Sequence, residues 1–204
     1  MTEKLKVGVL ISGSGTNLQA IIDAQQEGLP IDVVHVVSSR PDAYGIERAK
    51  AAGIPVLVLN QQLYADPRAA DEMIAATLKA SGVEYVVMAG YMRMVTGVML
   101  DAFPNRIVNL HPALLPSFVG AHAIQDAFDA GVKVTGVTVH FANAEYDKGP
   151  IIAQRAVAVR EDVTVDTLEA RIHEVEHEMY PQVLGWLADG RVQVLENGKV
   201  RIHE

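Results

Sequence analysis

Asn109 and His111 lie two residues apart at the end of a short apolar run that begins at Ile107, and Pro112 follows them directly. Residues two apart in an extended strand point to the same side of a sheet, and a proline is suited to ending a strand. An amide donor beside an imidazole suits a reaction that builds negative charge on a carbonyl oxygen, because both groups can donate hydrogen bonds to it. Asn and His also serve as turn and capping residues, so the pair needs further groups before it predicts a reaction.

A glycine-containing loop, Ser12-Gly13-Ser14-Gly15-Thr16-Asn17-Leu18, follows the first apolar run of the chain. Glycines let the backbone approach an anion closely, and the free N–H groups at the start of the next helix attract negative charge. The dinucleotide fingerprint is incomplete, because Leu18 replaces its third glycine or alanine and the second strand ends in Ser38-Ser39-Arg40 without an acidic residue. The Gly-Lys-Ser/Thr ending of nucleoside-triphosphate sites is missing too. We therefore expect a seat for one phosphate group, with an ordinary strand-to-helix turn as the alternative.

The segment His173-Glu174-Val175-Glu176-His177 matches the zinc-peptidase signature His-Glu-x-x-His and its inverted form, His-x-x-Glu-His. Residues four apart share a helix face, so the two histidines could hold zinc. The longer zinc-peptidase pattern fails, because its glycine and third-histidine positions are Tyr180 and Val183, and a ligand such as Glu196 would lie in the presumed terminal hairpin. Glu176 lies at the edge of an apolar helix stripe, where it could reach a cleft without any metal. We expect no metal site, and a zinc peptidase is the less favoured reading.

Short apolar runs of strand length alternate with stretches of helical periodicity along the chain. The predicted strands are Val7–Ser12, Val33–Ser38, Val56–Leu59, Tyr85–Met88, Ile107–Leu110, Val134–Phe141 and Ile151–Val159. The predicted helices are Asn17–Glu27, Ile46–Ala52, Asp66–Ser81, Gly97–Phe103 and Thr164–Asp189. This alternation predicts a single-domain α/β fold, a mostly parallel twisted sheet with helices on both faces. Residues 191–204 are expected to form a small terminal hairpin or tail that turns at Asn197-Gly198.

The composition excludes several classes of function. The 204 residues are 50% hydrophobic and 21% charged, with a formal net charge of −8 and no cysteine. That apolar share is enough for one core, and we expect residues 1–204 to form one domain. The negative charge argues against a broad DNA or RNA surface, and the missing cysteines exclude disulfides and cysteine nucleophiles. The apolar run Val7–Ile11 is too short for a signal peptide or a membrane span. We expect a soluble, cytoplasmic protein that binds small molecules, and neither nucleic acid nor membrane.

Several ordered motifs together resemble the folate-dependent formyltransferase family. They are Ser12–Asn17, Ala89-Gly90-Tyr91-Met92-Arg93, Asn109–Pro116, Gly120-Ala121-His122, Thr138-Val139-His140-Phe141 and Asp147-Lys148-Gly149-Pro150-Ile151-Ile152. The resemblance runs from the first strand to the long C-terminal helix, and the ordered set is far more specific than any one motif. It implies a Rossmann-like formyltransferase domain. As activity it implies transfer of the formyl group of 10-formyltetrahydrofolate, the co-substrate, to the amine of glycinamide ribonucleotide in de novo purine biosynthesis.

The resemblance also implies roles for individual residues. Asn109, His111 and Asp147 form the catalytic set, in which Asn109 and His111 stabilise a tetrahedral intermediate. The substrate phosphate is assigned to Gly15, Thr16 and Asn17, and the glycinamide end of the substrate to Glu176. The folate-binding positions are Arg68, Tyr91, Met92, Arg93, Met94, Val95, Asn109, Phe141, Ala142, Asn143 and Asp147. His122 and His140 could face the same cleft, but we expect structural roles for both.

Some positions depart from the family's pattern. Val119 stands where a proline is usual before Gly120, and Ala113 replaces a common serine. Asn143-Ala144 and Tyr146 make the following loop atypical, so the exact pterin contacts stay open. The apolar segment Tyr91–Leu100 is readable either as core or as the seam of a homodimer.

Two relatives with similar chemistry are alternatives. Methionyl-tRNA formyltransferase has a further C-terminal domain and a basic surface for tRNA, whereas this chain is acidic and only about a dozen residues follow the long helix. Formyltetrahydrofolate deformylase has an additional N-terminal domain, and its water-directed hydrolysis needs neither a phosphate loop nor Glu176. We keep a deformylase-like hydrolase as the alternative function.

Overall fold

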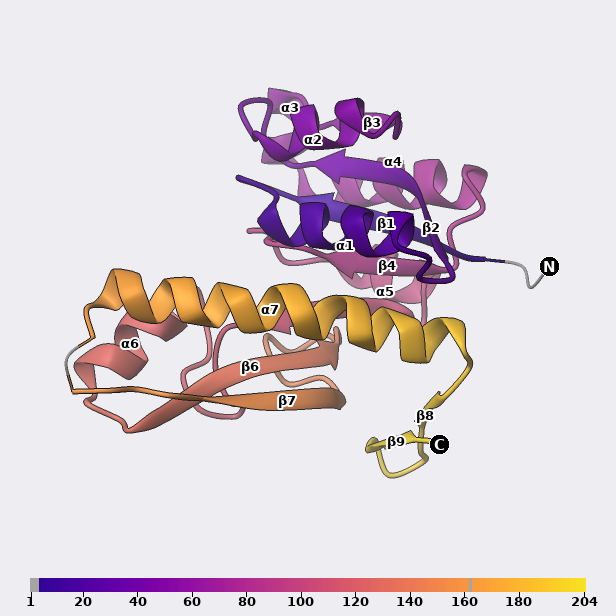
Figure 1. Ribbon diagram of the computed structural model, residues 1–204. Helices are drawn as coiled ribbons and strands as arrows, with labels where there is room; N and C mark the ends of the chain where they lie inside the picture. The colour runs from indigo at the N-terminus through magenta and orange to yellow at the C-terminus, as the bar shows by residue number, and fades with distance from the viewer. Residues whose placement is uncertain (1–3, 162) are drawn as a thin grey trace.

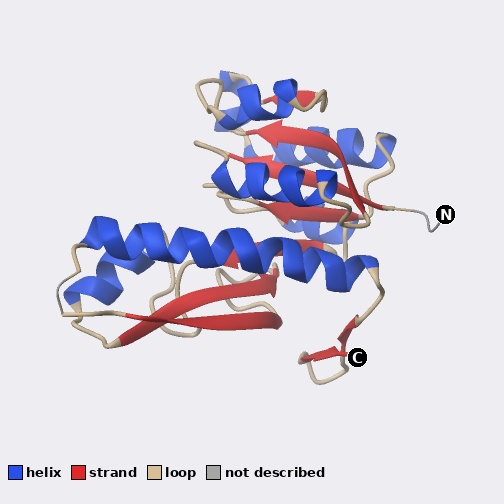
Figure 2. Cartoon of the chain, in the orientation of Figure 1, coloured by secondary structure: helices blue, strands red, loops and turns tan. Residues whose placement is uncertain are grey.

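The computed structural model describes residues 4–161 and 163–204 and contains a seven-stranded sheet with helices on both faces (Figure 1, Figure 2). Its strands are β1 (Leu5–Ile11), β2 (Ile31–Ser38), β3 (Val56–Val58), β4 (Tyr85–Met88), β5 (Ile107–His111), β6 (Val134–Phe141) and β7 (Ile151–Ala158). The helices are α1 (Thr16–Gln26), α2 (Gly45–Ala51), α3 (Gln61–Ala65), α4 (Pro67–Ala80), α5 (Gly97–Ala102), α6 (Ala123–Asp129) and α7 (Val165–Ala188). A separate antiparallel hairpin consists of β8 (Val192–Val194) and β9 (Val200–Ile202).

The strand order places the carboxyl ends of the central strands at a switch point. The sheet order is β3-β2-β1-β4-β5-β6-β7; the strands from β1 to β5 pair in parallel, and β6 and β7 pair antiparallel. The chain first builds outward from β1 to β3 and then returns to add β4 on the other side of β1. Ligands of open α/β sheets bind beyond the carboxyl ends of the strands at such a reversal.

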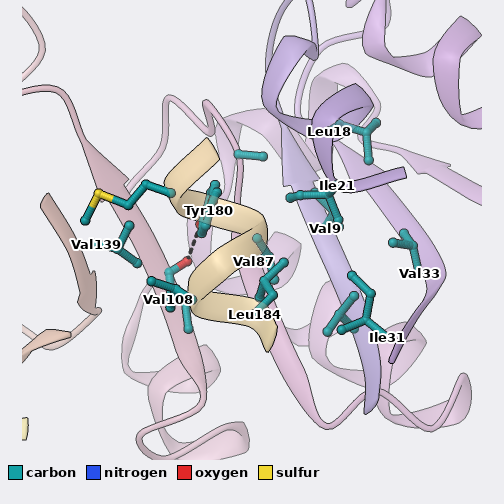
Figure 3. Packing of buried hydrophobic residues seen from close by; sticks show 14 of the residues in the cluster. Val9, Leu18, Ile21, Ile31, Val33, Val87, Val108, Val139, Tyr180 and Leu184 are labelled. Carbon is teal, nitrogen blue, oxygen red and sulfur yellow. Dashed lines mark hydrogen bonds between the residues drawn. The ribbon is translucent and has the colours of Figure 1, made fainter. Parts of the chain in front are cut away.

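Two apolar clusters hold the helices on the sheet. Alternate residues of β1 face opposite sides: Val7 and Val9 pack with α1 and α7, while Leu10 packs with α4 and α5. Figure 3 shows Val9 in the first cluster, together with Ile21 of α1 and Leu184 of α7. Each fully buried aliphatic side chain contributes about 1.5–3 kcal/mol, so burial on both faces dominates the stability of the sheet.

Helix α7 is fixed over the middle of the sheet by a buried tyrosine. The helix begins after a capping box formed by Thr164 and Thr167 and continues through Pro181. Tyr180 is fully buried, and its hydroxyl lies 3.0 Å from each of two carbonyl oxygens, those of Met88 in β4 and Val108 in β5, which share its one proton. Figure 3 shows the bond to Val108. A buried hydroxyl needs such partners, and these two set the position of α7 relative to both strands.

The predicted α/β architecture is found, and the ends of the predicted elements are shifted by at most two residues. Two short helices, α3 and α6, were not among the predicted elements. Helix α3 has five residues and none of them is buried, and α6 has seven, of which only Ala123 and Ala127 are buried. Such short segments bury too little to show a helical periodicity. Within the described ranges, every helix is too short or too polar to cross a membrane.

Candidate active site

The loops that follow β1, β2 and β4 are tied together at the switch point. The buried Ser12 shares a hydrogen bond of 2.6 Å between its Oγ and that of Ser39. The same Oγ accepts a hydrogen bond of 2.9 Å from the backbone N–H of Met92. The predicted phosphate loop and the predicted folate segment are therefore held side by side.

A first cavity contains the three predicted catalytic residues. It is bounded by segment 88–95, by residues 109–112 and 120–121, and by the loop 142–147. Asn109 and His111 come from β5 and Asp147 from the loop between β6 and β7, and all three line this cavity. The chain thus brings an amide, an imidazole and a carboxylate to one place, as the sequence analysis requires.

The imidazole of His111 faces a hydrogen-bond acceptor at each nitrogen. Its Nε2 lies 2.7 Å from the carbonyl oxygen of Phe118, and because a carbonyl only accepts, Nε2 carries a proton. Its Nδ1 lies 3.4 Å from Oδ2 of Asp147, in a pair whose side chains are 4% and 3% exposed. Both ring nitrogens of His111 therefore face oxygen acceptors inside the cavity.

His140 lies between two of the predicted catalytic residues, Asn109 and Asp147, a connection that the sequence analysis missed. It lies directly opposite Asn109 in the β5–β6 register. Its Nδ1 donates to the carbonyl oxygen of Phe141 at 2.9 Å, which leaves Nε2 to accept from the Asn109 amide nitrogen at 3.2 Å. Burial lowers the pKa of His140, against the opposing effects of the Phe141 carbonyl and of Asp147 at 3.8 Å. A neutral His140 therefore orients the amide of Asn109.

Asp147 is held in an unusual backbone conformation. Its φ angle is 53°, in the left-handed region, and its Oδ2 accepts a hydrogen bond of 3.0 Å from the backbone N–H of Gly120. Such a conformation costs a non-glycine residue about 1–3 kcal/mol and persists only where the surroundings determine it. Gly149 lets the chain pass closely here, because an added Cβ would lie 1.7 Å from the carbonyl oxygen of Phe141.

A second cavity adjoins the first and contains the predicted phosphate loop. Residues 13–17, 122–125 and the start of α7 surround it, including Glu169, His173 and Glu176. It shares with the first cavity the lining residues Gly90, Met92, Leu110, Pro112 and Ala121. His122 is exposed and lines this cavity rather than the core, contrary to the structural role expected for it.

The phosphate loop ends in a helix whose first turn is open to an anion. Gly15 is the N-cap of α1 with φ 70°, and no side chain caps the helix there. The N–H groups of this first turn therefore remain available to an anion. An added Cβ on Gly15 would lie 2.7 Å from Gly45 Cα, so only glycine fits. Arg48 adds positive charge, since its Nε donates to the carbonyl oxygen of Ser14 at 2.9 Å.

Glu176 and Asn17 meet in the second cavity although one lies near each end of the chain. The Asn17 amide donates to Oε2 of Glu176 at 2.9 Å. Nδ1 of His173 reaches the same oxygen at 2.9 Å. Glu176 lies one helical turn before Tyr180, whose two hydrogen bonds anchor this part of α7. The buried carboxylate is therefore fixed in direction, next to the open first turn of α1.

The predicted folate residues lie mostly around the first cavity. The segment Tyr91–Val95 lines it together with Ala142 and Asn143, and the side chains of Met92 and Met94 are strongly exposed. Arg93 stacks on the ring of Tyr64 at 4.7 Å and donates to its carbonyl oxygen. Phe141 is buried and stays outside the lining, although its carbonyl holds His140.

Arg68 lies away from both cavities. It is in the first turn of α4, where its guanidinium is exposed and pairs with Glu72 at 3.1 Å. Its neighbour Pro67 borders a groove that also includes Arg93. A role for Arg68 toward the folate stays a prediction.

The zinc-peptidase motif adopts a different arrangement. Both nitrogens of His173 face carboxylates, Nδ1 that of Glu176 at 2.9 Å and Nε2 that of Glu169 at 3.5 Å. Glu174, the glutamate next to the first histidine, is exposed. Among residues 4–161 and 163–204, no group of three or more metal-binding side chains is arranged to hold an ion.

Relatives of known name are similar to this chain over most of its length. Phosphoribosylglycinamide formyltransferase of Haemophilus influenzae is 40% identical over 193 residues, which are 94% of this chain and 91% of that protein. The enzyme of the same name from Bacillus subtilis is 41% identical over 180 residues, 88% of this chain and 92% of that protein. The trifunctional purine biosynthetic protein adenosine-3 of Gallus gallus is 42% identical over 200 residues. The chain spans about a fifth of the length of that trifunctional relative.

Solved structures give the same result. Glycinamide ribonucleotide transformylase 1 from Symbiobacterium toebii superimposes with a TM-score of 0.95 at 50% identity, covering 100% of this chain and 96% of that one. Phosphoribosylglycinamide formyltransferase from Anaplasma phagocytophilum gives 0.91 at 35% identity, covering 98% and 95%. A family model described as formyl transferase matches residues 5–184. The chain therefore belongs to the formyl transferase family, among the phosphoribosylglycinamide formyltransferases.

Proposed function

We propose that the protein transfers the formyl group of 10-formyltetrahydrofolate to the primary amine of glycinamide ribonucleotide, as a step of de novo purine biosynthesis. One observation carries this proposal: two cavities adjoin, and each suits one substrate. The first contains Asn109, His111 and Asp147, and the second contains the open first turn of α1 and Glu176. The names of the relatives identify glycinamide ribonucleotide and the transferred formyl group. The folate is assigned by the family resemblance.

The first cavity suits the folate. Its walls are backbone and apolar side chains of Tyr91–Val95 and of the loop that includes Ala142 and Asn143, a surface suited to a flat ring that needs backbone donors and acceptors. We assign these residues to pterin binding. Arg68 and Arg93 are assigned to the anionic glutamate end of the folate, Arg93 because it stands on the cavity wall and Arg68 by family resemblance alone.

The second cavity suits the phosphorylated amine. The uncapped N–H groups at Gly15, Thr16 and Asn17 would receive the phosphate, where the helix dipole favours negative charge. Glu176 would accept a hydrogen bond from the remainder of the substrate. The substrate amine can then extend toward the shared wall and the formyl carbon.

The catalytic step follows from the donors in the first cavity. The amine nitrogen attacks the formyl carbon, a new C–N bond forms, and the carbonyl oxygen becomes an oxyanion. The Asn109 amide carries two N–H donors, and since His140 takes one, the other remains for the oxyanion. The imidazolium of His111 adds a second positive donor, stabilised by Asp147. As the C–N bond to the folate breaks, the proton of the attacking amine moves to the leaving folate nitrogen, through water supported by Asp147.

A turnover assay tests the proposal. The purified protein, incubated with glycinamide ribonucleotide and 10-formyltetrahydrofolate, should form formylglycinamide ribonucleotide at the same rate with and without a chelator. Release of formate in the absence of the amine substrate, with no transfer in its presence, would instead indicate the deformylase alternative. Activity that the chelator abolishes and stoichiometric zinc restores would revive the metallopeptidase reading.

We further infer that the enzyme acts in the cytoplasm on small molecules.

We also infer that any homodimer would form through the segment Tyr91–Leu100. In this segment Met92 and Met94 are 74% and 57% exposed. Multi-angle light scattering of the wild type and of a Met92→Glu variant tests the contact. A dimer that the substitution leaves intact would place the interface elsewhere.

A further inference from the structure

Glu176 offers only one of its carboxylate oxygens to a ligand. Oε2 accepts from the Asn17 amide and from Nδ1 of His173, each at 2.9 Å, and the side chain is 4% exposed. Among the described residues no hydrogen bond reaches the other oxygen, Oε1, in the cavity that Glu176 lines. A ligand in this cavity therefore meets a lone acceptor, which selects a donor such as a sugar hydroxyl or an N–H group.

His173 stands at the wall of the same cavity, three residues before Glu176 on α7. Its Nε2 lies 3.5 Å from Glu169, and its ring stacks on that of His177 with 6.3 Å between centroids. The hydrogen bond to Glu176 raises the pKa of His173, and the charge of Glu169 acts in the same direction against the effect of burial. The charged form is the one that donates from Nδ1 while Nε2 faces a second carboxylate.

We propose that His173 is a positioning residue for the amine substrate: its Nδ1 holds Oε2 of Glu176 and so directs Oε1 to a hydroxyl or N–H group of the ribosyl-glycinamide part. Asn17 clamps the same oxygen from α1, so the carboxylate cannot rotate. This gives the segment His173–His177 a role in which no metal takes part. The identity of the substrate rests on the proposed function, whereas the contact between His173 and Glu176 is a property of the free protein.

Steady-state kinetics of three variants test the proposal. His173→Ala should raise KM for glycinamide ribonucleotide about tenfold, the size expected for losing one charge-assisted hydrogen bond, while kcat and KM for the folate stay near the wild-type values. In His173→Asn the amide nitrogen falls near the position of Nδ1 and should restore most of the affinity. In His173→Gln it falls near Nε2 and should not. Glu174→Ala, an exposed position in the same segment, is the matched control.

A double-mutant cycle separates positioning from a general effect on α7. If His173 acts through Glu176, then His173→Ala should raise KM no further in a Glu176→Ala background. Equal increases in both backgrounds, or an unchanged KM in His173→Ala with normal wild-type turnover, would overturn the inference while leaving the proposed function intact.

Histidine NMR tests the contact between His173 and Glu176 even if the wild-type protein fails to turn over this substrate. With ring-labelled histidine, the His173 resonances should titrate at lower pH in Glu176→Gln than in wild type, because the neutral amide withdraws a charge from Nδ1. Identical titration of His173 in both proteins would show that the contact has no influence, and would refute the positioning role directly. Circular dichroism confirms that each variant is folded.

Discussion

Replacing Asp147 by asparagine tests the proposed catalytic set at its most constrained residue. One carboxylate oxygen, Oδ2, accepts from the Gly120 backbone at 3.0 Å and faces Nδ1 of His111 at 3.4 Å. Asparagine has the same shape, but it offers either its oxygen or its nitrogen at that place. If the amide oxygen takes the place of Oδ2, it accepts the hydrogen bond from the Gly120 N–H, but the neutral residue no longer stabilises a positive charge on His111. If the amide nitrogen takes the place of Oδ2, it donates a hydrogen bond to Nδ1 of a neutral His111, and the Gly120 N–H loses its acceptor.

The two orientations of the asparagine amide set the expected loss of stability and of activity. One buried partner is left unsatisfied in either orientation, which costs about 1–3 kcal/mol of stability. For a domain of this size that corresponds to a fall in Tm of about 2–12 °C, so the fold should survive. Catalysis should suffer far more, because the positive donor and the proton route both depend on the lost charge. General acid–base assistance is worth about 100- to 10,000-fold, and we expect kcat to fall within that range.

The assay compares kcat and Tm for wild type, Asp147→Asn and the exposed control Asp101→Asn. Both substrates are held well above KM, so that weaker binding cannot imitate a slower chemical step. A folded Asp147→Asn enzyme whose kcat lies within about threefold of wild type, far below the range for acid–base catalysis, would refute the assigned role. Loss of soluble protein in Asp147→Asn alone would show that the carboxylate is chiefly structural.

Three further predictions concern the backbone around the two cavities and the neutral histidine. Gly149→Ala, whose Cβ would lie 1.7 Å from the Phe141 carbonyl oxygen, should cost about 3 kcal/mol or more and lower Tm in thermal denaturation; Gly97→Ala, where a Cβ meets nothing within 4 Å, serves as control. Gly15→Ala should raise KM for the phosphorylated amine about tenfold or more with little effect on that for the folate, because its Cβ would force the loop away from α2; equal KM values would argue against a phosphate seat. Burial holds the pKa of His140 below its ordinary value of 6.5, so the unfolded chain takes up the proton first as the pH falls. The free energy of unfolding therefore decreases as pH falls below 6.5. Wild type should therefore lose more Tm than His140→Gln between about pH 7.5 and about pH 5.5, and parallel losses would contradict the pKa direction.

The sequence predicts the layered fold because each central strand is buried on both faces. Runs such as Val7–Ile11 and Tyr85–Met88 are almost wholly apolar, and helical stretches of matching length separate them, which leaves few arrangements besides a parallel sheet. The pairing of β6 with β7 follows from the loop 142–150, which is too short to cross the sheet and must return antiparallel. The order of strands depends on contacts between distant segments, and no local pattern contains it.

The sequence likewise predicts only the part of the candidate site that depends on local spacing. Spacing within one strand places Asn109 and His111 on the same cavity, since both belong to β5. The bond between Asn109 and His140 depends on the register of two strands, and no spacing along the chain reveals that register. For the same reason the sequence analysis expected a structural role for His140 but did not predict its hydrogen bond to Asn109. A histidine within an apolar run that follows the predicted catalytic strand is the signal that could have found this bond.

The His-Glu-x-x-His match shows why a motif on a helix needs its tertiary contacts before it predicts chemistry. The two histidines and both glutamates lie on α7, but which glutamate points inward is decided by the rotation of the helix about its axis. Tyr180 fixes that rotation, because its hydroxyl must reach the carbonyl oxygens of β4 and β5. Four residues earlier, Glu176 then faces Asn17, and Glu174 is turned to solvent. The His-Glu-x-x-His signature needs the opposite choice, with Glu174 directed at a metal. That signature and its inverted form both need free histidine nitrogens, and here both nitrogens of His173 already face carboxylates.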